Sequence, residues 1–151
     1  MSVKKFKLLL LAIVGVFVLT GCGGKTLTCT MSESESGMEM KGKIVAKFKD
    51  DKVTNLKMTM DAKATNDEVK KSWSMMSSLL KSQYSDKKAD GVKVTSKVDD
   101  KKYTFSFSLE VDVNKASKDA LKEYGIDSLD AEKSGYDDAK KSLEKSGFKC
   151  K

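Results

Sequence analysis

The chain of 151 residues contains no proline, no histidine and no arginine, so all 29 of its basic residues are lysine. The absence of histidine removes the usual general base of enzyme active sites and the commonest zinc ligand. Charged residues make up 34% of the chain and hydrophobic residues 39%, which is the composition of a polar globular protein rather than a disordered one. The length is that of one domain.

The first 21 residues have the features of a bacterial signal peptide. Three lysines occur within the first seven residues, and an uncharged apolar run follows from Leu8 to Leu19. A helix of this length rises only about 18 Å, which is short of the roughly 30 Å that a membrane-spanning helix must cross. The run is therefore typical of a signal peptide rather than of a membrane anchor.

The segment Leu19-Thr20-Gly21-Cys22 matches the lipobox that precedes the modified cysteine of bacterial lipoproteins. We expect cleavage after residue 21, a diacylglyceryl group on the thiol of Cys22, and firm anchoring to the membrane by two or three acyl chains, palmitate among them. The alternative is an ordinary secretory signal with a chance cysteine. The predicted organisation is a signal peptide over 1–21, a lipidated tether over 22–24 and a single domain over 25–151. An exported domain is not expected to bind nucleic acid.

Alternating apolar and polar residues predict strands in the first part of the domain. The predicted strands are Lys25 to Met31, Met38 to Lys49 and Val53 to Ala62. The polar run over 32–37 predicts a loop between the first two. A loop of three residues, Asp50 to Lys52, would oppose Lys49 to Val53 and would keep the apolar residues of both strands on one face.

The period then changes from that of a strand to that of a helix. Its apolar positions are Val69, Trp73, Met76, Leu80 and Tyr84. Thr65, with Glu68 three residues later, predicts a capping box at the start of this helix. We expect Trp73, the only tryptophan, to be buried against the sheet.

A second hairpin and two helical segments complete the predicted domain. The hairpin joins strands over 92–98 and 103–113, with Val98 opposite Tyr103 and residues 99–102 as the connection. The helical segments begin near Lys118 and Tyr136, and Gly147 ends the second. The fold class is therefore α+β: an antiparallel sheet of about five strands, arranged as a three-strand meander, a helix and a hairpin, with two to three helices packed on one face.

Several segments resemble the YehR-like family of small bacterial lipoproteins. They are the lipobox, LKMTMDAKATNDEV, YTFSFSLEVDVNKASKDALKEYGIDS and the terminal GYDDAKKSLEKSGFK. The resemblance implies a membrane-anchored α+β domain whose biochemical function is unsettled, and it transfers no active-site residues.

Two cysteines remain once Cys22 is assigned to the lipid. Cys29 lies on the apolar side of the first strand, and Cys150 follows the last helix. Disulfides persist in exported proteins, so we predict a Cys29–Cys150 bridge that ties the two ends of the domain together. Two separate thiols are the alternative. A redox-active pair is disfavoured because no C-x-x-C spacing exists.

Methionines and paired aspartates are the other candidate ligands. Most of the methionines fall on inward positions, so we predict that they pack in the core rather than hold copper(I). The aspartate pairs at 50–51, 99–100 and 137–138 suit two turns and the first turn of a helix. We therefore predict no metal site, no cofactor and no catalytic residues.

A row of lysines is the most coherent surface feature of the predicted sheet. Its members are Lys41, Lys43, Lys47, Lys49 and Lys57. Such a row is usually a solvated face that protects the sheet. The functional interpretation is a contact for anionic envelope polymer or lipid headgroups near the membrane.

The sequence thus predicts a lipoprotein on the extracytoplasmic side of a bacterial membrane. We expect a non-catalytic binding or accessory module whose ligand the sequence does not name. One alternative is a carrier of a lipid or other apolar ligand in a groove between sheet and helix. Another is an enzyme with an unrecognised site. The sequence gives no indication of oligomeric state.

Overall fold

The computed structural model describes residues 24–123 and 135–151. The predicted signal peptide and the predicted lipidation site at Cys22 lie outside these residues. In the described parts of the chain, no helix has the length and apolar character needed to cross a membrane.

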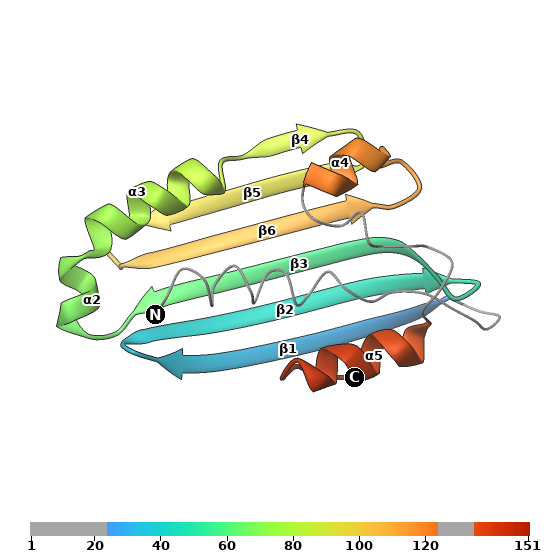
Figure 1. Cartoon of the computed structure of the whole chain (residues 1–151), viewed down its shortest axis with the longest axis horizontal. Helices are drawn as coiled ribbons and strands as arrows, with labels where there is room; N and C mark the ends of the chain where they lie inside the picture. Colours follow the sequence, from blue (N-terminus) through green and yellow to red (C-terminus); the bar gives the residue numbers. More distant parts are fainter. Residues whose placement is uncertain (1–23, 124–134) are drawn as a thin grey trace.

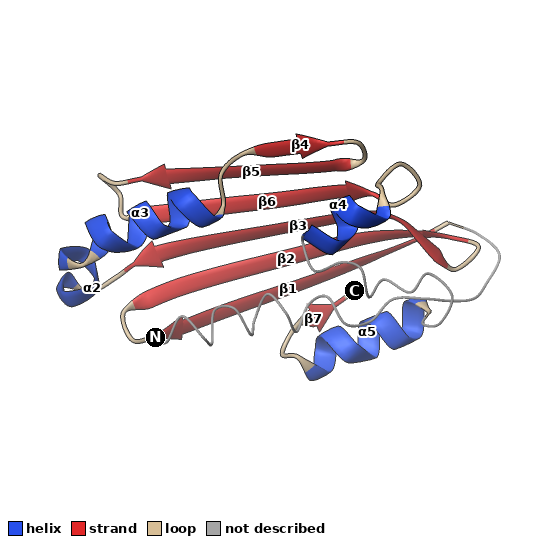
Figure 2. Cartoon of the chain, turned by 45° about the horizontal axis from the view of Figure 1, so that its top comes forward, coloured by secondary structure: helices blue, strands red, loops and turns tan. Residues whose placement is uncertain are grey.

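Within the described residues, seven antiparallel strands form one sheet, in the order β4-β5-β6-β3-β2-β1-β7 (Figure 1; β7 is labelled in Figure 2). The strands are β1 (Lys25–Glu35), β2 (Met38–Lys49), β3 (Lys52–Ala64), β4 (Lys87–Ala89), β5 (Val92–Asp99), β6 (Thr104–Asp112) and β7 (Lys149–Cys150). The α+β class and the antiparallel sheet are confirmed. The count of about five strands is wrong because β4 and β7 are too short to show an alternating pattern.

The described helices pack on one face of this sheet, which we call the inner face (Figure 2). They are α2 (Asp67–Lys71), α3 (Trp73–Gln83), α4 (Lys118–Glu123) and α5 (Tyr136–Lys145). Trp73 of α3 and both Ala139 and Leu143 of α5 join one buried cluster with the inner-face residues of the strands. The opposite side of the sheet is the outer face.

The β2–β3 hairpin has a tighter turn than the sequence predicted. Asp50 and Asp51 both have positive φ, 48° and 58°, as in a two-residue type I′ turn. Lys49 therefore opposes Lys52, and a β-bulge at Thr54 restores the predicted register farther along the strands. Apart from Val45, the apolar residues of both strands lie on the inner face, as predicted.

The β5–β6 hairpin is shifted by two residues from the predicted register, so Val98 opposes Phe105 rather than Tyr103. The side chain of Asp99 accepts hydrogen bonds from the backbone nitrogens of Lys101 and Lys102, at 3.1 and 3.0 Å. Tyr103 then turns the chain with a φ of 53°. A shift of two keeps every side chain on its predicted face.

Two other boundaries differ from the predictions. Asn66, rather than Thr65, caps α2, and its side-chain oxygen accepts from the backbone nitrogen of Val69 at 2.9 Å. Thr65 instead extends the sheet by donating its backbone N–H to Gly37. Strand β1 also continues through the predicted loop, and only Ser36 and Gly37 form the turn.

The end of the chain returns to the first strand. Helix α5 ends before Gly147, whose φ of 93° reverses the chain as predicted. Phe148 then enters the core, and β7 pairs with β1. Cys29 and Cys150 are directly opposed and are joined by the predicted disulfide.

Candidate functional site: the outer face of the sheet

The outer face carries an exposed grid of polar side chains that the strand register arranges in rows. One row crosses β2, β3, β6 and β5 as Lys43, Thr59, Ser108 and Thr95. The next row toward the start of β1 runs through Val45, Lys57, Glu110, Lys93 and Lys88. Lysines predominate on β2, whereas threonine and serine are common on β1 and β6.

The five lysines singled out from the sequence are all exposed, but they are not equivalent. Lys41, Lys43, Lys47 and Lys57 share the outer face. Lys49 lies beside the β2–β3 turn, opposite Lys52. Four of the five lysines therefore form the predicted exposed row, which ends at this turn.

Two of these lysines are neutralised by carboxylates. Lys41 contacts Glu39 at 2.8 Å, and Lys57 contacts Glu110 at 2.6 Å. The hydrogen bond from Lys41 and its charge lower the pKa of Glu39, and Glu39 in turn raises the pKa of Lys41. Both partners of each pair are substantially exposed, so these contacts order the face more than they stabilise the fold.

A hollow of about 560 Å³ lies on the outer face, at the end of the sheet where β1 begins. We call it the Lys93 hollow. Its lysines are Lys47, Lys57, Lys88, Lys93 and Lys115. Its two carboxylates are already engaged, Glu110 with Lys57 and Asp112 with Lys115 at 3.3 Å. Within the described residues, Lys47, Lys88 and Lys93 have no carboxylate within 4.0 Å.

Glu110 lies between two cations of this hollow. It is directly opposite Lys57 on one neighbouring strand and Lys93 on the other. The hydrogen bond and charge of Lys57, with a smaller contribution from the charge of Lys93, hold the pKa of Glu110 below its ordinary value. Glu110 is therefore ionised at neutral pH.

A second hollow of about 510 Å³ lies toward the β1 edge of the sheet. We call it the Lys43 hollow. Lys41, Lys43 and Lys149 line it together with the carboxylate of Asp61 and the hydroxyl-bearing residue Thr59. Asp61 accepts a hydrogen bond from Ser106 at 2.7 Å. Of the predicted lysine row, Lys41 and Lys43 thus line this hollow, Lys47 and Lys57 line the Lys93 hollow, and Lys49 lines neither.

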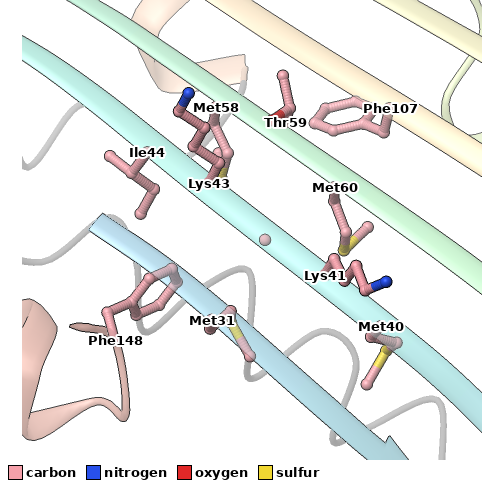
Figure 3. Close-up of a pocket in the computed structure, with 11 residues that line it drawn as sticks. Met31, Met40, Lys41, Lys43, Ile44, Met58, Thr59, Met60, Phe107 and Phe148 are labelled. Atoms are coloured by element: carbon pink, nitrogen blue, oxygen red, sulfur yellow. The ribbon is translucent and has the colours of Figure 1, made fainter. Parts of the chain in front are cut away.

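A small cavity on the inner face is the structural counterpart of the predicted carrier groove (Figure 3). Its lining includes Met31, Met40, Met58 and Met60, with Phe107 and Phe148 (Figure 3). The cavity measures about 20 Å³, which is room for about one water molecule. An acyl chain would therefore enter this cavity only if these side chains moved.

The methionine prediction is largely confirmed. The buried ones are Met31, Met38, Met40, Met58 and Met60. Met76 packs partly against the core, whereas Met75 is 74% exposed on α3. These side chains fill the space between the sheet and its helices, as flexible thioethers commonly do.

Ionisable groups are scarce in the described interior. Asp51 and Ser77 are the polar residues buried there, and they lie far apart in the chain. In residues 24–123 and 135–151, no three cysteine or carboxylate side chains are grouped closely enough to hold a metal ion. The outer face is therefore the candidate site, because its two hollows bring lysines, carboxylates and hydroxyl groups together.

Sequence reasoning missed Lys88, Lys93 and Lys115 as members of the site. Lys88 belongs to an unpredicted strand, and Lys115 follows the end of β6. Lys93 alternates with the apolar Val92 and Val94 and so lies on the polar face of its strand, but only the pairing of β3 with β6 brings that face beside Lys57. This pairing joins two hairpins far apart in the sequence, and no local pattern indicates it.

Comparisons with known proteins describe the fold. No family model matches the chain, and no curated protein matches it. An NMR structure of a protein from Streptococcus pneumoniae TIGR4 aligns with a TM-score of 0.53 and 17% identity, covering 90% of this chain and 90% of that chain. The NMR structure of the Escherichia coli YehR protein aligns with a TM-score of 0.47 and 20% identity, covering 85% of this chain and 92% of that chain. The pneumococcal structure shows that this fold has a solved counterpart.

Proposed function

We propose that this chain is a membrane-anchored lipoprotein of the YehR-like type whose domain binds an anionic component of the cell envelope without catalysis. The observation that carries the proposal is the outer face, where Lys47, Lys88 and Lys93 line one hollow and have no carboxylate within 4.0 Å among the described residues. Three ammonium groups around a recessed surface attract anions from solution. Lysine supplies mobile point charges, so the expected contact depends on summed electrostatics.

The expected anchor supports this role by its position. Cys22 precedes Lys25, the first residue of β1, by three residue steps, which span at most about 11 Å. The Lys93 hollow lies at the same end of the sheet. A lipid on Cys22 would therefore keep this hollow close to the membrane surface. The Cys29–Cys150 disulfide is consistent with an extracytoplasmic location.

The binding test uses the purified mature lipoprotein in detergent and dextran sulfate as a general polyanion. Wild type should bind at low salt and release as salt rises, because screening shortens the reach of the lysine charges to about 8 Å at physiological ionic strength. Combined Lys43→Glu, Lys47→Glu and Lys93→Glu should weaken binding at least tenfold. The matched control carries Lys71→Glu, Lys101→Glu and Lys141→Glu, which change the same charge at exposed sites off the outer face.

Equal loss of affinity in both variants would show that only net charge matters, and no binding by wild type would overturn the proposal.

The predicted lipid anchor is tested separately. Metabolic labelling with palmitate should mark wild type and leave Cys22→Ala unlabelled. Labelling of both proteins would exclude Cys22 as the lipidated residue.

A further inference from the structure

We propose that the ligand of the Lys93 hollow is a linear polyanion whose phosphate groups are joined by neutral linkers and which lies across the strands. This inference rests on the proposed function and names the kind of anion. It concerns one end of the outer face rather than the lysine row as a whole. The argument comes from the placement of charges along the hollow.

Two lysines lie directly opposite each other at one end of the hollow. Lys88 of β4 and Lys93 of β5 are opposed residues on the outer face. Directly opposed like charges destabilise a sheet, because the two side chains start only about 5 Å apart. In the part of the chain that the structure describes, neither lysine has a carboxylate within 4.0 Å. A phosphate bound between the two ammonium groups would relieve this repulsion.

The positive charge at the centre of the hollow is already balanced by a carboxylate. Lys57 and Glu110 form an ion pair at 2.6 Å, and Glu110 stands between Lys57 and Lys93 in the same row. A second anion would face the Glu110 carboxylate there. The centre thus favours a neutral part of the ligand, while the cations without a carboxylate within 4.0 Å favour its charged groups at the two ends.

The two cationic ends are too far apart for one phosphate. Lys47 lies on β2 and Lys88 on β4, which are separated by four strand steps in the sheet order. At about 4.8 Å per step, their backbones are about 19 Å apart. One phosphate can contact Lys88 and Lys93 together, but a ligand that also reaches Lys47 must be a chain.

The arrangement of the cations in a row favours a chain over a membrane surface. A bilayer presents its headgroups over a whole plane, whereas Lys57, Lys93 and Lys88 follow one line across neighbouring strands. A single flexible chain can enter the hollow and follow its length across the strands. The structure therefore favours a polymer over a planar array of headgroups.

The test measures how affinity depends on ligand length. Synthetic phosphodiesters with neutral propanediol linkers and one, two, four or eight phosphates are titrated against the mature lipoprotein in detergent at fixed ionic strength. Affinity should rise at least tenfold from one phosphate to four, because a longer chain occupies both ends at once. It should change little from four to eight, once the hollow is spanned.

Paired variants locate the site. Lys88→Gln with Lys93→Gln should lower the affinity for the four-phosphate chain at least tenfold and reduce its length dependence. Lys41→Gln with Lys43→Gln removes the same charge from the Lys43 hollow and should change affinity less than threefold. Both variants replace exposed side chains, so thermal unfolding should match wild type and confirm that each is folded.

Failure of this inference can be distinguished from failure of the proposed function. Equal effects of the two variants, or affinity that rises steadily with phosphate number, would mean a diffuse contact and would overturn this inference while leaving anion binding intact. Stronger capture by phosphatidylcholine vesicles containing phosphatidylglycerol than by vesicles lacking it, without binding to any phosphodiester chain, would assign the face to headgroups instead. Failure to bind dextran sulfate as well would overturn the proposed function itself.

Discussion

The indole nitrogen of Trp73 donates a hydrogen bond to the carboxylate of Asp100 across 3.0 Å. Asp100 also accepts a hydrogen bond from Lys81 at 2.9 Å. These bonds join α3 to the loop between β5 and β6. Asp100 was expected to serve only as a turn residue, whereas Asp99 alone satisfies the turn backbone.

Shortening Trp73 should strongly destabilise the domain. Trp73 is 2% exposed, and its ring meets that of Tyr103 edge-on at 6.2 Å. Trp73→Ala removes this packing and should lower the free energy of unfolding by about 3 to 5 kcal/mol. Trp73→Phe keeps an aromatic ring but loses the bond to Asp100, so its loss should be smaller. Urea unfolding monitored by circular dichroism measures both, and equal losses would show that packing contributes little.

Asp100 should make stability sensitive to acid. Hydrogen bonds from Lys81 and Trp73, together with the nearby hydroxyl of Ser77, lower its pKa below the ordinary 3.8. A lowered pKa in the folded state adds stability above the ordinary value, and this stability is lost as pH falls through the folded pKa. Asp100→Asn should therefore lower the melting temperature at pH 7 and reduce the further loss below about pH 4. Parallel melting curves for the two proteins would contradict this assignment.

The disulfide should stabilise the domain by limiting its unfolded state. Cys29 and Cys150 are 121 residues apart, and a loop of this order corresponds to about 4 to 5 kcal/mol in the chain-entropy model. Reductant should lower the melting temperature of wild type but leave the double variant Cys29→Ser, Cys150→Ser unchanged. The bridge also holds β7 against β1, so hydrogen exchange at Thr28 and Thr30 should accelerate in that variant.

The faces of the strands could be predicted from the sequence because each one-residue step reverses the side chain. Leu27, Ile44 and Phe105 are buried as the alternation indicates, and parity fixed which residues share a face. Parity does not distinguish registers two residues apart. The β5–β6 shift therefore depended on the Asp99 turn and on the positive φ of Tyr103, which the sequence does not signal.

The candidate site was predicted in part for a similar reason. Lys41, Lys43 and Lys47 lie along one strand, so their common face follows from local alternation. The residues that pair with these lysines cannot be predicted from local alternation. Glu110 reaches Lys57 only because β6 pairs with β3, a contact between residues 53 positions apart. The lysines on one strand can be found from the sequence, but the carboxylates that balance their charge lie on strands that only the tertiary structure brings together.

The β2–β3 turn should be open to stabilisation. Asp50 and Asp51 hold positive φ, and the Oδ1 atom of Asp51 is buried without a hydrogen-bond partner. Asn-Gly is the preferred pair for this turn and removes the buried side chain of Asp51. Asp50→Asn with Asp51→Gly should raise the free energy of unfolding by about 1 kcal/mol, a typical gain for such changes. Chemical unfolding measures this gain, and a loss would indicate that the Asp51 carboxylate has a stabilising role.

Glu110 should limit the affinity of the Lys93 hollow for polyanions. Its carboxylate stands between Lys57 and Lys93, and the hydrogen bond and charge of Lys57 lower its pKa further below neutral pH. Glu110→Gln leaves both lysines uncompensated, so binding of the four-phosphate chain should tighten severalfold and depend more steeply on salt. Glu144→Gln on α5 is the matched control, since Glu144 faces Lys140 at 4.0 Å, away from the outer face. Titrations of both variants at two ionic strengths decide the matter, and weaker binding by Glu110→Gln would indicate that the carboxylate orients Lys57 toward the ligand.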